Sequence, residues 1–188
     1  LLNDKKDRIK LYRKIDEEED CLVESMPQIY YDGAYVGGFD AFEPCQNSPP
    51  HTWLNLTGGS IGQGGPVSVG AAVACPEKQV VSLLGDGAAM YTLQALWTQA
   101  REGLNVTTII YKNEKYRILE IEYWRLGVNE IGEKAGDLFN LGEPSIDFCA
   151  LAKGMGVESV SVNTLESFKA ALEVAFSRTG PYLIEACI

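Results

Sequence analysis

Short apolar runs alternate with helical stretches over the second half of the chain, and this alternation constrains the fold more than any other feature. Three runs have the length and composition of buried strands: 80–84, 106–111 and 182–186. Three further stretches show helical periodicity: 91–101, 148–155 and 165–176. Parallel strands joined by helices form a sheet with helices on both faces. The pattern predicts a three-layer, Rossmann-like α/β domain with a mainly parallel sheet.

The first 45 residues differ in character from the rest, and a polar run rich in proline at 44–50 follows them. We place a domain boundary in this run, so that one domain covers 1–45 and the other 46–188. Residues 9–15 alternate as a short strand does. Residues 28–31, followed by Asp32 and Gly33, predict a strand that enters a hairpin turn. The N-terminal segment is therefore expected to be a short β-hairpin fragment.

Acidic residues outnumber basic ones by 26 to 16, which gives the chain a formal net charge of −10. Such a charge repels phosphate at long range, so neither nucleic acid nor a membrane is expected as a partner. No apolar run approaches the roughly 20 residues of a membrane span, and the N-terminus lacks the apolar core of a signal peptide. We expect a globular protein of the cytoplasm.

The five cysteines are scattered, odd in number and without a Cys-x-x-Cys pair. Neither a disulfide framework nor a zinc site is expected, and buried reduced thiols account for the cysteines. The chain begins without a methionine, inside a charged stretch. We therefore expect a fragment of a longer protein or a fusion.

A glycine-rich junction directly follows the first apolar run. Gly85-Asp86-Gly87 stands between the strand and a helical pattern, where glycines allow a tight turn and the close approach of a ligand. The free N–H groups of the following helix favour an anion such as a diphosphate. Asp86 would face the same anion, which is unfavourable unless a cation lies between them. A turn without any ligand is the alternative for this tripeptide taken alone.

Asn113 follows the next apolar run, 27 positions after Asp86. Successive strands of a parallel sheet end at the same edge, where ligands of open α/β sheets bind, so the two side chains are expected to converge. Mg²⁺ prefers oxygen ligands in octahedral geometry. One carboxylate, one amide oxygen, a backbone carbonyl, two diphosphate oxygens and water would complete such a site.

Four motifs between residue 51 and the C-terminus resemble the C-terminal domain of thiamine-diphosphate enzymes of the acetolactate synthase and benzoylformate decarboxylase family. They occupy 57–66, 84–91, 146–157 and 180–185. The resemblance implies thiamine diphosphate and Mg²⁺ as cofactors. It also implies that the complete enzyme is a homo-oligomer that decarboxylates a 2-oxo acid or joins it to an acceptor.

The resemblance assigns roles at the diphosphate end of the cofactor. Asp86 and Asn113 match the side-chain ligands of Mg²⁺, and Lys115 matches a ligand that acts through its backbone carbonyl. The diphosphate itself is expected at the turn formed by Gly85, Gly87, Ala88 and Ala89.

Further positions match residues at the pyrimidine end. Ile61 matches the large apolar residue that keeps the cofactor bent, and Gly59 would then offer its carbonyl to the pyrimidine amine. Ile118 and Leu119 match apolar residues that lie against the cofactor. Ordinary core packing is the alternative for all three apolar side chains. His51, the one histidine, precedes the glycine loop, and this place makes it a candidate active-site residue. A structural or solvated role is the alternative.

No catalytic residue is assigned in this sequence. In the family, a glutamate of a separate N-terminal domain activates the cofactor at the pyrimidine N1′, and the paired domains usually come from two subunits. Neither the glutamates at 17–19 nor Glu24 lie in a matching context. We therefore expect a chain that needs the pyrimidine-binding domain of a partner subunit and is inactive alone. A non-catalytic binding module or remnant is the alternative.

Residues 9–43 resemble the C-terminal half of a glutaredoxin instead. The positions that match the glutathione-binding residues of that family are Met26, Pro27, Gly38, Phe39 and Asp40. The Cys-x-x-Cys that thiol-disulfide exchange requires is missing, and Cys21 lies too near Pro27 in sequence to replace it. A glutathione-binding redox protein is the third hypothesis.

Overall fold

The computed structural model describes residues 29–31, 34–37, 52, 54, 57–128 and 130–188. The chain divides into two compact units, 1–52 and 53–188, and each is considered by itself. Several predictions fall outside the described residues: the strand at 9–15, the glutathione-binding positions and His51.

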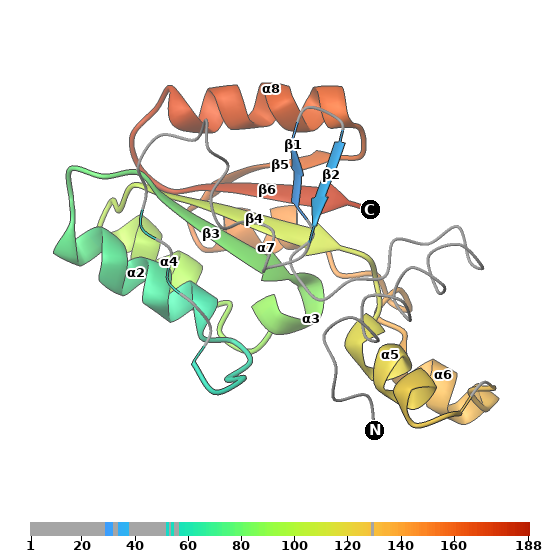
Figure 1. Cartoon of the computed structure of the whole chain (residues 1–188). Coiled ribbons are helices and arrows are strands. Elements are labelled where there is room, and N and C mark those ends of the chain that lie inside the picture. Colours follow the sequence, from blue (N-terminus) through green and yellow to red (C-terminus); the bar gives the residue numbers. More distant parts are fainter. Residues whose placement is uncertain (1–28, 32–33, 38–51, 53, 55–56, 129) are drawn as a thin grey trace. The chain divides into compact units, whose positions relative to one another are not determined.

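Two short strands form an antiparallel pair in the first unit. β1 covers Ile29–Tyr31 and β2 covers Ala34–Gly37, and Tyr31 pairs with Ala34 in their register. This pairing confirms the hairpin expected before the α/β domain (Figure 1).

A four-stranded, all-parallel sheet forms the centre of the second unit, with the strand order β3-β4-β6-β5. The strands are β3 (Val80–Gly85), β4 (Val106–Lys112), β5 (Glu158–Val162) and β6 (Tyr182–Cys187). The two central strands are almost entirely buried, whereas the two edge strands are partly exposed. The parallel sheet predicted from continuous apolar runs is confirmed.

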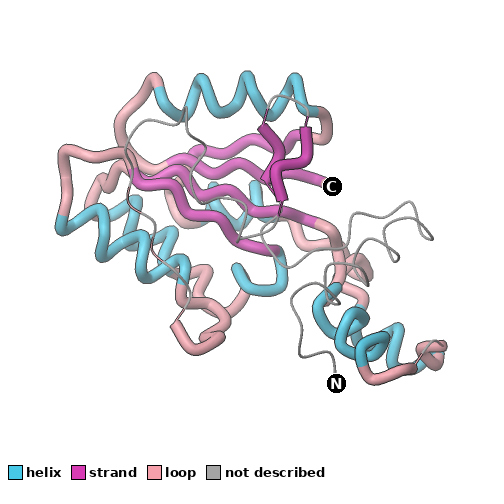
Figure 2. The backbone as a smooth tube through the Cα atoms, viewed as in Figure 1, coloured by secondary structure: helices cyan, strands magenta, loops and turns pink. Residues whose placement is uncertain are grey.

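Helices cover both faces of this sheet. α2 (Gly64–Ala74), α4 (Ala95–Arg101) and α7 (Phe148–Gly154) lie on one face, and α8 (Leu165–Phe176) lies on the other (Figures 1 and 2). α5 (Arg117–Arg125) and α6 (Glu133–Phe139) lie beyond the carboxyl ends of the strands, where Tyr123 and Phe139 pack edge to face. The predicted three-layer α/β architecture is therefore confirmed.

Neighbouring residues of the central strands contribute to separate hydrophobic clusters. Ile110 of β4 packs in a cluster with Leu96 and Phe148, from the helices of one face. Ile109, one position earlier, packs in a cluster with Ala171 and other side chains of α8. Successive strand residues point to opposite faces, so a continuous apolar run supplies both clusters.

The helix predicted over 91–101 is partly wrong, because α4 begins only at Ala95. The preceding residues form turns instead. The Thr92 hydroxyl donates a 2.6 Å hydrogen bond to the carbonyl of Gly62, which ties this turn to the loop before α2.

The sequence patterns also do not predict β5, α2, α5 or α6. β5 alternates serine with valine, so it lacks the apolar run that marks the other three strands of the sheet. α2 begins with two glycines and Pro66, which normally indicate a loop. Pro66 is tolerated because the N–H groups of the first helical turn have no partner within the helix.

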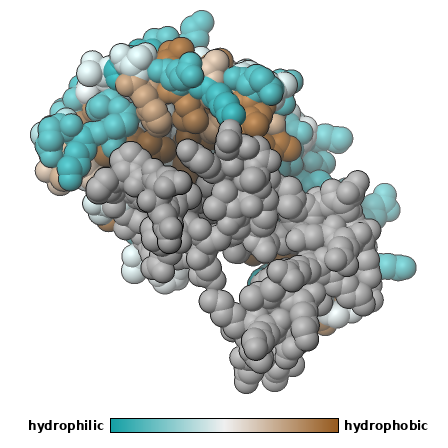
Figure 3. All heavy atoms as spheres, turned by 45° about the horizontal axis from the view of Figure 1, so that its top comes forward, coloured by the Kyte–Doolittle hydropathy of each residue, from teal (hydrophilic) through white to brown (hydrophobic). Residues whose placement is uncertain are grey.

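The outer surface of α8 keeps some apolar area in contact with solvent. Leu165, Val174 and Phe176 are 40%, 47% and 55% exposed, and the face turned forward in Figure 3 shows brown apolar surface between hydrophilic side chains. Among the described residues, no helix combines the length and the apolarity that a bilayer crossing requires.

Candidate functional site

The residues expected to hold a diphosphate and a metal lie at the carboxyl ends of β3 and β4. Gly85 pairs with Tyr111 in the parallel register, so Asp86 and Asn113 follow the ends of adjacent strands. After Gly85 the chain enters α3, the single turn Asp86–Ala89. The sheet therefore brings these segments to one edge, as the sequence predicted.

Asp86 is a buried carboxylate, only 4% exposed. Its Oδ1 accepts a 2.8 Å hydrogen bond from the N–H of Gly87, and its Oδ2 accepts a 2.7 Å bond from the N–H of Glu114. Burial raises the pKa of the Asp86 carboxyl, and the backbone hydrogen bonds, Gly87's the largest, oppose that rise. The carboxylate thus joins the turn after β3 to the loop after β4.

No lysine or arginine of the described chain forms an ion pair with Asp86. A buried charge that lacks a partner is costly. A divalent cation would supply the missing charge, and a carboxylate oxygen is a ligand that Mg²⁺ prefers. The chemistry of this donor therefore fits the metal expected there.

The loop after β4 presents an amide oxygen and a backbone carbonyl. Asn113 Oδ1 accepts a 3.0 Å hydrogen bond from the N–H of Lys115, which closes a short turn. Lys115 Nζ lies 3.7 Å from Glu120 Oε1, so its ammonium is engaged outside this turn. Within the described part of the chain, no hydrogen-bond donor reaches the Lys115 carbonyl. That carbonyl is therefore available to a ligand.

The predicted donor set contains a single carboxylate. Groups of three or more His, Cys, Asp or Glu side chains that could hold a metal do not occur among the described residues. A site built from Asp86, an amide and a carbonyl is of a different kind, so the roles of Asp86, Asn113 and Lys115 stay predictions.

Gly87 lies against an aromatic ring. A Cβ on Gly87 would come 2.5 Å from Cε1 and 2.9 Å from Cδ1 of Tyr116, closer than carbon atoms can approach. Ala88 and Ala89, which follow in the same turn, are small as well, and Ala89 is 1% exposed. The Tyr116 ring therefore leaves no room for a side chain at Gly87, whether or not a ligand binds there.

The loop 57–63 carries the residues predicted for the pyrimidine end. Gly59 has a φ of 70°, in the left-handed region, and a Cβ there would meet nothing within 4 Å. Gln63 closes the loop, because its Oε1 accepts a 3.0 Å hydrogen bond from the N–H of Thr57. Ile61 is 56% exposed, which does not fit the alternative of ordinary core packing.

Ile118 and Leu119 lie in the first turn of α5 and are 47% and 41% exposed. They too are not core residues in this structure. All three apolar positions proposed to contact the cofactor therefore keep surface that another molecule can cover, although their contact with a cofactor stays a prediction.

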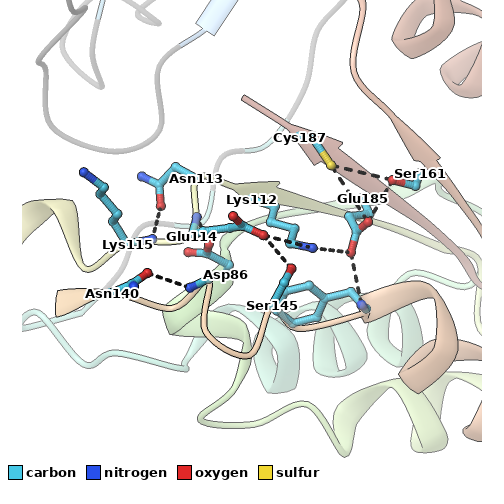
Figure 4. A network of polar contacts seen from close by, with 12 residues as sticks. Asp86, Lys112, Asn113, Glu114, Lys115, Asn140, Ser145, Ser161, Glu185 and Cys187 are labelled. Carbon is cyan, nitrogen blue, oxygen red and sulfur yellow. Dashed lines mark hydrogen bonds and ion pairs between the residues drawn. The ribbon is translucent and has the colours of Figure 1, made fainter. Parts of the chain in front are cut away.

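A polar network beside the loop after β4 was not anticipated from the sequence (Figure 4). Lys112 Nζ lies 3.5 Å from Glu114 Oε1 and 3.8 Å from Glu185 Oε2. A 2.5 Å hydrogen bond from the Ser145 hydroxyl, and next the Lys112 ammonium, lower the pKa of the Glu114 carboxyl. One sequence signal could have indicated the network: a glutamate inside the otherwise apolar run 182–186.

The model of the thiamine pyrophosphate enzyme C-terminal TPP-binding domain matches residues 36–186. The chain belongs to this family. Thiamine pyrophosphate, or TPP, is another name for thiamine diphosphate, so TPP is the cofactor of this domain.

Two relatives show which branch this TPP-binding domain resembles. It is 51% identical over 142 residues to the "Putative acetolactate synthase large subunit IlvX" of Mycobacterium tuberculosis, across 75% of this chain and 28% of that protein. It is 38% identical over 136 residues to the benzoylformate decarboxylase of Pseudomonas aeruginosa, across 72% of this chain and 24% of that protein. The domain is thus of the acetolactate synthase and benzoylformate decarboxylase type.

Solved structures agree with this assignment. The thiamine diphosphate-dependent 4-hydroxybenzoylformate decarboxylase of Rhodococcus jostii RHA1 superposes with a TM-score of 0.60 at 38% identity, covering 66% of this chain and 22% of that one. The benzoylformate decarboxylase of Polynucleobacter necessarius gives 0.62 at 29% identity, covering 70% and 24%.

The chain spans about a quarter of the length of the curated relatives it matches. The family match begins at residue 36, before the boundary predicted after residue 45 and inside the stretch 9–43. The boundary and the glutaredoxin resemblance of 9–43 both stay predictions.

Proposed function

We propose that this chain holds TPP through Mg²⁺ at the carboxyl edge of its sheet and forms half of the active site of a 2-oxo acid decarboxylase or carboligase. One observation carries the proposal: Asp86 is a buried carboxylate without a cationic partner in the described chain, and it joins the turn after β3 to the loop after β4. A divalent ion placed there neutralises the carboxylate and attracts a diphosphate.

Three oxygen donors would hold the metal: the carboxylate of Asp86, the amide oxygen of Asn113 and the carbonyl of Lys115. The first two follow adjacent strand ends, and the third has no donor among the described residues. The diphosphate oxygens would occupy further positions of the octahedron. The remaining contacts of the diphosphate would come from the turn that comprises Gly85, Gly87, Ala88 and Ala89.

Gly59, Ile61 and Ile118 would face the rest of the cofactor. When bound, TPP would supply the electron sink that accepts the electron pair left behind as carbon dioxide departs from a 2-oxo acid. The exposed side chains of Ile61 and Ile118 would exclude water from that cofactor, and Ile61 would fix its bend. The Gly59 carbonyl would accept a hydrogen bond from the pyrimidine amine. None of these groups is suited to move the proton that activates TPP.

The activating glutamate would come from the pyrimidine-binding domain of a partner subunit, which makes the complete enzyme a homo-oligomer. The matched region makes up about a quarter of the curated relatives, whose remaining length can hold a further domain. A 2-oxo acid would be the substrate, and neither nucleic acid nor membrane would be a partner of so acidic a chain. The cytoplasm remains the expected compartment.

Calorimetric titration of the 188-residue chain with TPP tests the proposal. Binding should require Mg²⁺ and disappear when EDTA removes the metal, because the diphosphate is held through it. Equal heat with and without Mg²⁺, or no binding at any accessible cofactor concentration, would contradict a metal-dependent TPP site.

Addition of a separate pyrimidine-binding domain then distinguishes an enzyme half from a non-catalytic binding module. An enzyme half should gain decarboxylase activity with that domain. A binding module that lacks catalytic competence should keep its Mg²⁺-dependent affinity and gain none.

A further inference from the structure

Glu114 has an unusual backbone conformation. Its φ is 57°, and it is the one residue other than glycine with a positive φ in the described part of the chain. A side chain makes this left-handed conformation unfavourable, whereas glycine adopts it freely. A glutamate at this position therefore needs contacts that compensate for the strain.

Backbone hydrogen bonds fix Glu114 on two sides. Its N–H donates to Asp86 Oδ2 at 2.7 Å, and its carbonyl accepts a 2.7 Å bond from the N–H of Leu141. The residue before it is Asn113, and the residue after it is Lys115. The left-handed turn at Glu114 thus decides where the other two proposed metal donors point.

The Glu114 side chain adds two further contacts. Its Oε1 accepts a 2.5 Å hydrogen bond from Ser145 Oγ and lies 3.5 Å from Lys112 Nζ. Its Oε2 lies so close to Gly142 that a Cβ there would approach it to 3.1 Å. We call Lys112, Glu114 and Ser145 the Glu114 clamp (Figure 4).

The clamp is anchored in the core of the domain. Lys112 Nζ also lies 3.8 Å from Oε2 of Glu185, a side chain that is 5% exposed. Glu185 accepts hydrogen bonds from the N–H of Phe148 at 3.0 Å and from Ser161 Oγ at 2.8 Å. Displacement of Glu114 would therefore disturb contacts that reach α7, β5 and β6.

We propose that the Glu114 clamp is a positioning device that holds the loop after β4 in its metal-binding conformation before any metal arrives. The proposal rests on the proposed function, because it assigns the metal to Asp86, Asn113 and Lys115. Glu114 acts through its neighbours: its carboxylate is occupied by Ser145 and Lys112, and its left-handed backbone sets the turn between Asn113 and Lys115.

Two glutamate substitutions separate a positioning role from direct coordination of the metal. Glu114→Ala removes the side-chain contacts and keeps the strain, so it should weaken Mg²⁺-dependent TPP binding by about tenfold, as changes around metal ligands do. Glu114→Gly also removes the carboxylate but relieves the strain, so it should recover most of that loss. Glu173→Ala, which changes an exposed glutamate of α8, serves as the control.

Hydrogen exchange on the cofactor-free chain provides a second measurement that needs no ligand. The Leu141 amide donates to the Glu114 carbonyl, so its exchange should accelerate in Glu114→Ala and in Ser145→Ala but not in Glu173→Ala. Ser145 is exposed, and its substitution keeps the test possible if Glu114→Ala does not fold.

The outcomes distinguish the clamp from the site it serves. Failure of the unmodified chain to bind TPP with Mg²⁺ overturns the proposed function, and exchange at Leu141 then decides the clamp alone. If the unmodified chain binds and Asp86→Ala does not, wild-type affinity in Glu114→Ala overturns the clamp. Equal loss in the alanine and glycine variants, together with unchanged affinity in Ser145→Ala, overturns the positioning role in favour of a direct ligand. If hydrogen exchange at the Leu141 amide is unchanged in both Glu114→Ala and Ser145→Ala, the clamp does not hold the loop before a metal binds.

Discussion

Asp86 Oδ2 accepts a 2.7 Å hydrogen bond from the backbone N–H of Glu114, 28 residues further along the chain. The other oxygen of the same carboxylate accepts a bond from the N–H of Gly87. One buried side chain therefore aligns the turn after β3 with the loop after β4. This alignment explains why the residues proposed to hold diphosphate and metal can act together.

Asp86→Ala should abolish Mg²⁺-dependent TPP binding, with a loss of roughly 10²-fold or more, because it removes the one charged ligand of the proposed site. The variant should still fold, at a cost of about 1–3 kcal/mol, since two buried N–H groups lose their acceptor. Titration calorimetry measures the affinity, and thermal unfolding measures the cost. Asp137→Ala, at an exposed aspartate of α6, is the matched control. Unchanged affinity in Asp86→Ala would remove Asp86 from the site.

Asn113→Ala should weaken Mg²⁺-dependent binding less, by about tenfold, because a neutral amide contributes a ligand without a charge. Asn113→Asp keeps an acceptor for the Lys115 N–H and adds a charge, so it should bind Mg²⁺ at least as well as the unmodified chain. Equal and severe losses in both variants would show that the amide N–H₂ group, and not the oxygen, is required.

Gly87→Ala should destabilise the domain by about 1–3 kcal/mol, because the added methyl forces the Tyr116 ring to move. Gly70→Ala is the contrasting variant. Gly70 lies inside α2 with nothing within 4 Å of its Cβ position, so alanine should stabilise the domain by about 0.5–1 kcal/mol. Chemical denaturation of both variants measures these opposite signs. A stable Gly87→Ala chain would show that the Tyr116 ring yields without cost.

Cys149 should react slowly with thiol reagents at mildly alkaline pH. Burial raises the pKa of its thiol, and nearby carboxylates add to that rise. A raised pKa leaves less of the reactive thiolate at a given pH, so the rate of alkylation should keep increasing with pH beyond the point where an ordinary thiol levels off. Peptide mapping after timed alkylation gives the rate at each pH. If the alkylation rate of Cys149 levels off at or below the pH at which that of a model thiol does, the pKa of Cys149 is not raised.

The isolated chain should not turn over pyruvate or benzoylformate. The group expected to activate TPP lies in a domain outside this chain, and a cofactor held at one end keeps its reactive carbon in water. Steady-state assays with Mg²⁺ and saturating TPP check this. Turnover near ordinary enzyme rates, roughly 1 to 10³ s⁻¹, would show that a group of this chain performs the activation.

The sequence alone determined the layers of the fold and the edge at which the proposed site lies. The runs before Gly85 and Asn113 are largely apolar, and such runs become parallel strands of an α/β sheet because helices cover both faces of the sheet. Parallel strands all end at one edge, so the spacing of Asp86 and Asn113 was enough to predict that they converge. The strand β5 alternates serine with valine and has no such run, so the sequence pattern did not predict it.

Only the tertiary structure decided which contacts fix that edge. The left-handed turn at Glu114 depends on Lys112, which is close in sequence, but also on Ser145 and Leu141, which are about 30 residues away. Nothing in a stretch of Lys-Asn-Glu-Lys indicates that the glutamate takes a conformation favoured by glycine. Local patterns record which surfaces must be buried, whereas a strained turn held by distant hydrogen bonds exists only once the chain has folded around it.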